Sequence, residues 1–330
     1  MAPVARFGGR WAVSPRTSLR LALISLAGLL LIIPSGALVR LTDSGLGCPD
    51  WPGCHGGVVP PLSGHAWIEY SNRVFSGIVV AMAVIAWLGV RLVRDAPRAL
   101  RRWGAAPALA GIAQGPLGGL TVLFDLHPLL VASHFMLSML ALGSGTVFVL
   151  HARDHVHGRA RDLDVGRAGL AGITLAALGG VVVTGVLVTA AGPHSGDPAV
   201  IRRLGSLADA AALHARVVIG FVALAIALGV WLVRRRPADP LTLRLALVFV
   251  PVLALQVGLG EYQYHHHLPW RVILGHVTLA GAVWSLGVAV AWLAARPLRA
   301  GVTDSAYDGR LGGMVRGRSE ATVSRQTSST

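Results

Sequence analysis

The sequence predicts an all-α integral membrane protein with eight transmembrane helices, and three observations lead to that fold class. The 330-residue chain is 54% hydrophobic and only 13% charged, about half the charged fraction of a soluble domain. Eight stretches carry no Asp, Glu, Lys or Arg, and each is close to the length of a membrane-spanning helix. Basic residues gather on alternate connections between them. Stretches this long exceed barrel strands, so helices are predicted.

The eight charge-free stretches are, in order, 21–39, 74–90, 103–124, 126–152, 168–196, 217–233, 245–260 and 272–295. The first is too long for the apolar part of a signal peptide, and Arg40 follows it without a small-residue cleavage site. It is therefore predicted to be an uncleaved helix. The two longest stretches include polar loop residues, whereas the shortest extend through a flanking charge.

Charge patterning predicts the orientation. All 29 basic residues are arginine, and 23 of them lie in the N-terminal tail, in the second, fourth and sixth connections and in the C-terminal region. The positive-inside rule therefore predicts a multi-pass plasma-membrane protein with both termini in the cytoplasm. Because topology explains the net charge of +14, the lipid bilayer is the expected partner and nucleic acid is not.

A weak internal repeat relates the two halves of the chain. Gln114 and His134 recur 142 residues later as Gln256 and His276, and at the same offset Asn72 corresponds to His214. The segment Gly36-Ala-Leu-Val is matched by Gly185-Val-Leu-Val at an offset of 149. We interpret this as a tandem duplication of four-helix bundles, related by a pseudo-twofold axis along the membrane normal.

The repeat divides the chain into five predicted regions. They are a cytoplasmic N-terminal tail (1–18), an N-terminal four-helix bundle (19–152), a cytoplasmic linker (153–167), a C-terminal four-helix bundle (168–296) and a disordered cytoplasmic tail (297–330).

Four polar residues are predicted to lie in one layer near the outer leaflet. Asn72, His134, His214 and His276 each fall one or two turns from the outer end of an even-numbered helix. Two imidazoles at matching depth in the second half are typical of axial haem ligands. A lone buried histidine is more often a hydrogen-bonded core residue, but repetition inside the membrane favours ligation. Zinc is less favoured, because no cysteine or carboxylate joins the pair.

The first half differs at this layer. Glu69 lies three residues before Asn72 and shares its helix face. A carboxylate inside a membrane needs a partner or a function. One interpretation is an ion pair with Arg73 at the membrane edge. The other is a proton-handling group beside a reactive centre. Arg73 could pair with Glu69 or with a haem propionate.

The only two cysteines, Cys48 and Cys54, lie in the first outward-facing loop. An oxidising compartment favours a disulfide there. The pair is either a loop staple or a redox-active or assembly-linked pair. Its five intervening residues do not make a CxxC motif, and two cysteines alone rarely make a metal site.

Five segments together carry a family resemblance: GALVRLTDSGLGCPDWPGC (36–54), IEYSNR (68–73), VASHF (131–135), LHARVVIG (213–220) and LGHVTL (274–279). In this order on eight helices they resemble the haem A synthase family, from about residue 19 to residue 296. The resemblance implies a membrane oxidoreductase that converts a ring methyl of haem O to a formyl group, giving haem A for terminal oxidase assembly. It also implies a haem b cofactor in the C-terminal half and the substrate haem in the N-terminal half.

Carried over by position, the resemblance implies roles for individual residues. His214 and His276 correspond to the haem b ligands, His134 to a substrate-haem ligand and Glu69 to the family's catalytic glutamate. The pair Cys48 and Cys54 matches the outer-loop cysteines of one class of the family.

Asn72 departs from the pattern, because many members carry the second substrate-site histidine there. One hypothesis is a five-coordinate substrate iron on His134 alone, with Asn72 hydrogen-bonding above it. Arg216 and Gln256 are further expected haem contacts. Arg216 lies near His214 and would bind a propionate, or else is an ordinary membrane-edge arginine.

Two other functional classes compete with this interpretation. A di-haem b-type electron carrier explains the C-terminal histidines but not Glu69 or Asn72. A transporter accounts for internal repeats but leaves the histidine layer unexplained. Expected partners of the synthase are the haem O synthase that makes the substrate and a quinone or other electron-transfer partner.

Overall fold

The computed structural model describes residues 4–299 apart from 8–9, 195, 201–202 and 236–238. In these residues eight helices are long and apolar enough to cross a membrane. They are α1 (Pro15–Leu41), α2 (Gly64–Arg91), α3 (Arg98–Leu123), α4 (Pro128–Val156), α5 (Val165–Ala191), α6 (Leu207–Arg235), α7 (Pro240–His265) and α8 (Trp270–Ala295). The predicted eight-helix fold is confirmed, and the chain is a multi-pass membrane protein.

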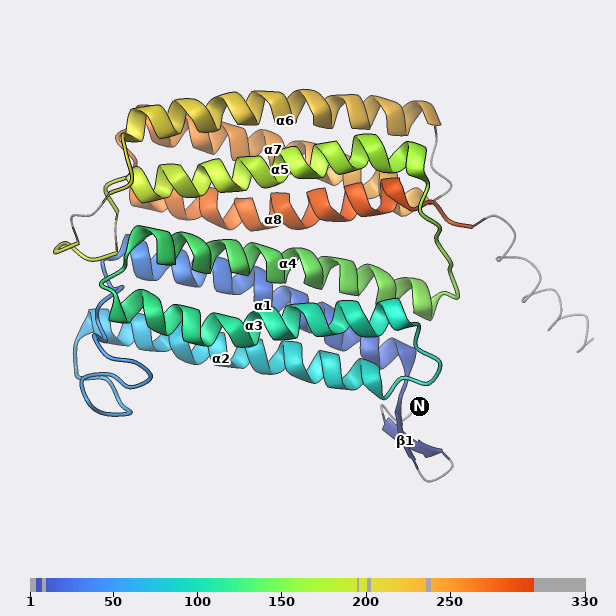
Figure 1. Ribbon diagram of the computed structural model, residues 1–330, viewed down its shortest axis with the longest axis horizontal. Coiled ribbons are helices and arrows are strands. Elements are labelled where there is room, and N and C mark those ends of the chain that lie inside the picture. Colours follow the sequence, from blue (N-terminus) through green and yellow to red (C-terminus); the bar gives the residue numbers. More distant parts are fainter. Residues whose placement is uncertain (1–3, 8–9, 195, 201–202, 236–238, 300–330) are drawn as a thin grey trace, which may run out of the picture.

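The helices form two groups of four that lie side by side (Figure 1). In the first group α1 and α3 each pack against α2 and α4. In the second, α5 packs against α6 and α8, and α7 packs against α8 and only lightly against α6. Contacts of α8 with α1 and α4, and of α4 with α5, join the groups. The duplication and its pseudo-twofold axis stay predictions.

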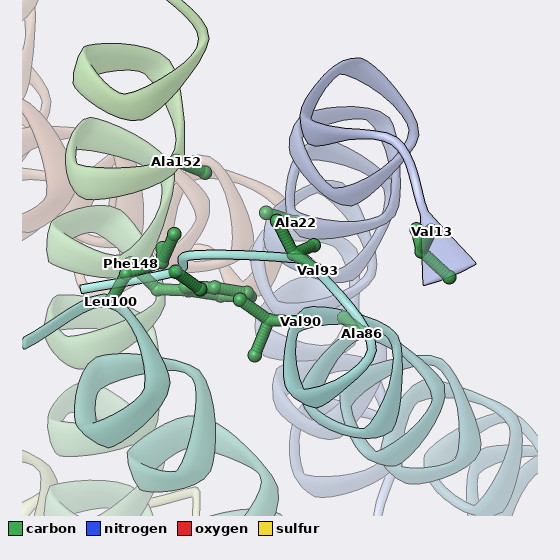
Figure 2. Packing of buried hydrophobic residues seen from close by; sticks show 9 residues of the cluster. Val13, Ala22, Ala86, Val90, Val93, Leu100, Phe148 and Ala152 are labelled. Carbon is green, nitrogen blue, oxygen red and sulfur yellow. The ribbon is translucent and has the colours of Figure 1, made fainter. Parts of the chain in front are cut away.

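A cluster of buried apolar residues lies at the end of the first group where α2 passes into α3 (Figure 2). Val90, Leu100 and Phe148 are almost fully buried there. Val13 joins them from the segment before α1, because its backbone N–H donates to the carbonyl of Leu92 at 3.0 Å. This packing fixes the end of the group that lies opposite the α1–α2 loop.

The boundary between the groups combines close helix approach with polar contacts. The indole Nε1 of Trp284 donates to the carbonyl of Met139 at 2.7 Å, and the hydroxyls of Thr146 and Ser285 lie 2.8 Å apart. A Cβ on Gly143 would lie 2.9 Å from Trp284 Nε1. Small residues of this kind let membrane helices approach closely, so α4 and α8 form a fixed junction.

Two terminal segments add detail that the sequence did not predict. The strands β1 (Val4–Phe7) and β2 (Arg10–Val13) form an antiparallel hairpin before α1. Residues 297–299, assigned above to the C-terminal tail, contact the linker, because Arg299 donates to both carboxylate oxygens of Asp162 at 2.6 and 2.7 Å. The remainder of that tail, 300–330, and its predicted disorder lie outside the described residues.

Candidate functional site

The loop between α1 and α2 is closed by a disulfide, which confirms the predicted pairing of Cys48 and Cys54. Both cysteines are buried against Ala66 and Tyr70 of α2. Asp50 closes the same loop by accepting from the backbone N–H groups of Gly56 and His55 at 2.7 and 2.6 Å. These hydrogen bonds, the one from Gly56 above all, hold the pKa of the Asp50 carboxyl below its ordinary value.

Glu69 lies beneath this loop with its side chain only 6% exposed. Its Oε1 is 2.5 Å from Arg73 Nη2, and its Oε2 accepts from the backbone N–H of Cys48 at 2.7 Å. Both oxygens therefore face donors, which is the environment of a carboxylate. The ion pair considered above is present, and it connects α2 directly to the disulfide loop.

Arg73 extends this connection to the loop backbone. Its guanidinium donates to the carbonyls of Cys48, Asp50 and Gly53 at 2.9, 2.9 and 2.7 Å. These bonds and the Glu69 pair occupy both terminal nitrogens. Arg73 thus holds the loop on α2, and a propionate would have to share those nitrogens with the loop.

The polar layer predicted from the repeat lies close to the ends of four helices. Asn72, His134, His214 and His276 follow the first residues of α2, α4, α6 and α8 by six to eight positions, or about 9 to 12 Å of helix. The four helices all begin at the end that carries the Cys48–Cys54 loop, which we call the disulfide end. All four side chains are partly buried.

The two glutamine–histidine pairs are both in contact, but in different ways. Gln256 Nε2 lies 3.2 Å from His276 Nε2. Gln114 Nε2 instead donates to the backbone carbonyl of His134 at 3.0 Å and to Ser138 Oγ at 2.5 Å. In each pair the imidazole Nδ1 and the glutamine Oε1 are buried without a hydrogen-bond partner.

These unpartnered atoms allow a test of whether the residues fit a haem. Buried polar atoms normally find a partner, so these four atoms leave the layer open to a bound group. No cluster of three or more His, Cys, Asp or Glu able to hold a metal ion occurs among the described residues. A porphyrin needs only axial ligands from the protein, and His214 and His276 lie at matching depths, seven and six residues after the first residues of α6 and α8. The residues therefore fit a haem better than a bare metal ion.

Two of the cavities in the described residues bear on the site. One of about 380 Å³ opens between α1 and α2 beside Asn72, and its lining consists of Ser35, Leu38, Trp67, Ile68, Ser71, Asn72 and Phe75. The other, of about 70 Å³, lies in the second group among largely apolar side chains and includes none of the predicted site residues. The first cavity places open space next to the predicted substrate side.

The structure does not bring Arg216 together with the other site residues. Arg216 is exposed and lies two positions after His214, a spacing that puts two side chains on different faces of a helix. Ser35 and Thr184, in contrast, touch the layer and were not predicted. Their signal was present, because each directly precedes a glycine of the matched segments at the 149-residue offset.

A family model described as cytochrome oxidase assembly protein (COX15-CtaA) matches residues 19–288. The chain belongs to this family. It is also similar to curated proteins named heme A synthase. That of Shewanella oneidensis is 34% identical over 131 residues, covering 34% of this chain and 39% of the relative. That of Alkalihalophilus pseudofirmus is 36% identical over 137 residues, covering 40% and 45%.

A third relative, the heme A synthase of Shouchella clausii, is 37% identical over 131 residues, covering 38% of this chain and 42% of the relative. The chain thus spans less than half the length of the curated relatives it matches. The family resemblance drawn from the motifs is confirmed over most of this chain by the family model.

Proposed function

We propose that this chain is a haem A synthase, which oxidises a ring methyl of haem O to the formyl group of haem A. The observation that carries the proposal is the layer of His134, His214 and His276 with its unpartnered buried atoms. Membership of the cytochrome oxidase assembly protein family and similarity to relatives named heme A synthase support it.

In the second group, His214 and His276 would hold a haem b, each through one imidazole nitrogen. When bound, a haem with two imidazole ligands supplies reversible one-electron chemistry. The protein supplies two rings at one level of the bundle, with Gln256 against the His276 ring. At the 142-residue offset Ala211 stands where the first half has Glu69, which suits a group that is retained and not transformed.

In the first group, His134 holds the iron of the substrate haem. Asn72 replaces a second imidazole, and its Oδ1 accepts from Ser35 Oγ at 2.9 Å. An amide engaged in this way is a weak competitor for iron, so the substrate iron is five-coordinate. The cavity beside Asn72 gives the substrate room on this side.

Glu69 handles a proton near the substrate, while Arg73 fixes its position. The carboxylate lies one turn before Asn72 on the same helix, and its charge is balanced by Arg73 at 2.5 Å. Oxidation of a methyl carbon releases protons, and a fixed carboxylate can accept them. The loop bonds of Arg73 then couple the disulfide to the position of Glu69.

The wider setting of the enzyme follows from its chemistry and charge. The reaction removes electrons and inserts oxygen, so it requires an electron-transfer partner such as a quinone, and a haem O synthase supplies the substrate. The arginine pattern supports a cytoplasmic position for both termini. The disulfide end then faces the oxidising side of the plasma membrane, where a disulfide is stable.

Haem extraction tests the proposal. The full chain is purified from cells that co-express a haem O synthase, and its haems are separated by chromatography after acid extraction. We expect haem B together with haem A. Haem B alone, despite available haem O, would contradict the synthase and favour a di-haem electron carrier.

A further inference from the structure

Two adjacent residues of α5, Thr184 and Gly185, form a seat for the imidazole of His214. Thr184 Oγ1 lies 3.0 Å from His214 Nδ1. A Cβ on Gly185 would lie only 3.2 Å from Cε1 and 3.6 Å from Nδ1 of the same ring. The glycine leaves space for the ring, and the hydroxyl fixes its rotation.

The hydrogen-bond partners of Thr184 determine which nitrogen of His214 carries the proton. A hydroxyl has one hydrogen to donate and two lone pairs that accept. Thr184 Oγ1 also lies 2.9 Å from the carbonyl of Gly180 and 3.1 Å from that of Val181. A carbonyl only accepts, so the hydroxyl hydrogen is used there. Its oxygen is left to accept from Nδ1–H, which leaves the Nε2 lone pair of His214 free.

We propose that Thr184 is a positioning residue that sets the tautomer of His214 and presents Nε2 to the haem iron. The proposal rests on the haem site proposed above. A hydrogen bond to the second nitrogen is the usual way in which a ligating imidazole is oriented and made more basic. The Nδ1 atoms of His134 and His276 are buried without such a partner. Thr184 therefore distinguishes His214 from the other two rings.

The first half of the chain retains the same seat. Ser35 and Gly36 of α1 stand at the 149-residue offset from Thr184 and Gly185. Ser35 Oγ donates to Asn72 Oδ1 at 2.9 Å, and a Cβ on Gly36 would meet no atom within 4 Å. In both halves a hydroxyl next to glycine orients the polar side chain of the layer. Recurrence in two halves indicates a device for orientation and not a chance contact.

Substitution of Thr184 tests this role. Thr184→Val keeps the shape and removes the hydroxyl, and Thr184→Ser restores it. The matched control is Thr174→Val, because Thr174 is a buried threonine of α5 whose hydroxyl donates to the carbonyl of Leu170 at 2.8 Å and touches no histidine. The readouts are the rate of haem loss, the reduction potential of the haem and its electron paramagnetic resonance spectrum, all on the purified full chain.

We expect Thr184→Val to lose haem about 10- to 100-fold faster, as for other residues that orient metal ligands, with a higher reduction potential because His214 becomes less basic. Thr184→Ser and Thr174→Val should match the wild type. A Thr184→Val protein with unchanged haem loss, potential and spectrum would overturn the inference.

A second variant keeps the test informative if Thr184→Val does not fold. Gly185→Ala fills the seat and should change the spectrum of the bound haem, whereas Gly179→Ala, where a Cβ meets no atom within 4 Å, should not. An unchanged spectrum of the Gly185→Ala protein would contradict the claim that Gly185 leaves space for the His214 ring. The His214→Ala variant separates the two proposals. If this variant retains a low-spin haem, the haem site itself is overturned. If it loses the haem while Thr184→Val behaves like the wild type, only the role of Thr184 is overturned.

Discussion

The two halves of the molecule differ most at the start of their second helices. In the first half α2 carries Glu69, Asn72 and Arg73, and the offset of 142 residues places Ala211, His214 and Ala215 at the corresponding positions of α6. The ion pair of one half is thus replaced by two alanines in the other. Charge inside a membrane is costly and is retained where it has a function. The contrast supports the proposal that one half holds a cofactor and the other transforms a substrate.

The halves nevertheless meet at the disulfide end. Arg40 of α1 donates from Nη2 to the carbonyl of Thr189 at 2.6 Å. The backbone N–H of Gly45 donates to the carbonyl of Gly196 at 2.7 Å. These bonds join the segment that precedes the disulfide to the end of α5. The two halves are therefore in direct contact beside the disulfide loop.

Glu69→Gln should produce the largest difference between the two halves, because it should lower haem A formation without changing haem B content. The amide still accepts from Cys48 N–H but carries no charge, so proton transfer is lost while the loop stays in place. We expect haem A formation to fall by about 100-fold, with haem B content unchanged. Haem chromatography measures both. The control is Glu261→Gln, at an exposed glutamate that contacts His265. Full activity of Glu69→Gln would show that Glu69 only holds the loop in place.

Cys48→Ala should have the next largest effect. Without the disulfide, the backbone groups that Glu69 and Arg73 bind are no longer held by a covalent link. We expect haem A formation to fall by about tenfold, which corresponds to about 1.4 kcal/mol of lost positioning. Haem B content should stay at the wild-type level. Loss of haem B from this variant would show instead that the loop stabilises the whole molecule.

Asn72→His would sharpen the comparison by making the halves alike. Ser35 and Gly36 provide the seat that an imidazole needs, as Thr184 and Gly185 do for His214. We expect substrate-loaded protein to change from a high-spin to a low-spin spectrum at its first site. A wild-type protein whose substrate iron is already fully low-spin would contradict the five-coordinate site.

The smallest effect is expected from a substitution at Asp239, at the end of the molecule opposite the disulfide end, where the linker meets the second group. The guanidinium of Arg161 contacts both Asp154 and Asp239. Burial raises the pKa of the Asp239 carboxyl, but the hydrogen bond and charge of Arg161 and the backbone N–H of Leu241 outweigh it, so this pKa lies below its ordinary value of 3.8. A lowered pKa stabilises the fold fully above about pH 3.8, and this contribution is lost as the pH falls through the folded-state value.

Asp239→Asn should therefore lower the free energy of unfolding by on the order of 1 kcal/mol at pH 7, because the amide oxygen still accepts hydrogen bonds. Below pH 3.8 the free energy of unfolding of the variant should fall less steeply with decreasing pH than that of the wild type. Thermal unfolding across this range measures both effects. Asp209→Asn, at an exposed position in the first turn of α6, is the control. An identical pH profile for wild type and Asp239→Asn would contradict the coupling to Arg161.

Much of the architecture was predictable, because membrane lipid restricts the fold. Charge-free stretches located all eight helices, and the offsets of the repeat located the polar layer. The hairpin before α1 and the contact of Arg299 with Asp162 were not predicted, because each depends on pairing between segments without a periodic apolar pattern.

The site was predictable only in part. The types and depth of His214 and His276 followed from the sequence, whereas the contacts of Arg73 with three loop carbonyls did not, since they depend on how the loop folds back over α2. Thr184 was missed although it directly precedes Gly185 of the matched segments, because its contact with His214 depends on how α5 packs against α6. Arg216 was chosen by its distance along the chain, and the helix turns it away from His214.

Haem composition in a pair of variants tests the division of labour between the halves most directly. His134→Ala and His276→Ala are each purified from cells that supply haem O, and their haems are extracted and quantified. The division predicts that His134→Ala retains haem B but yields no haem A, and that His276→Ala loses haem B. A His134→Ala protein that loses haem B while His276→Ala retains it would contradict the assignment of the two halves.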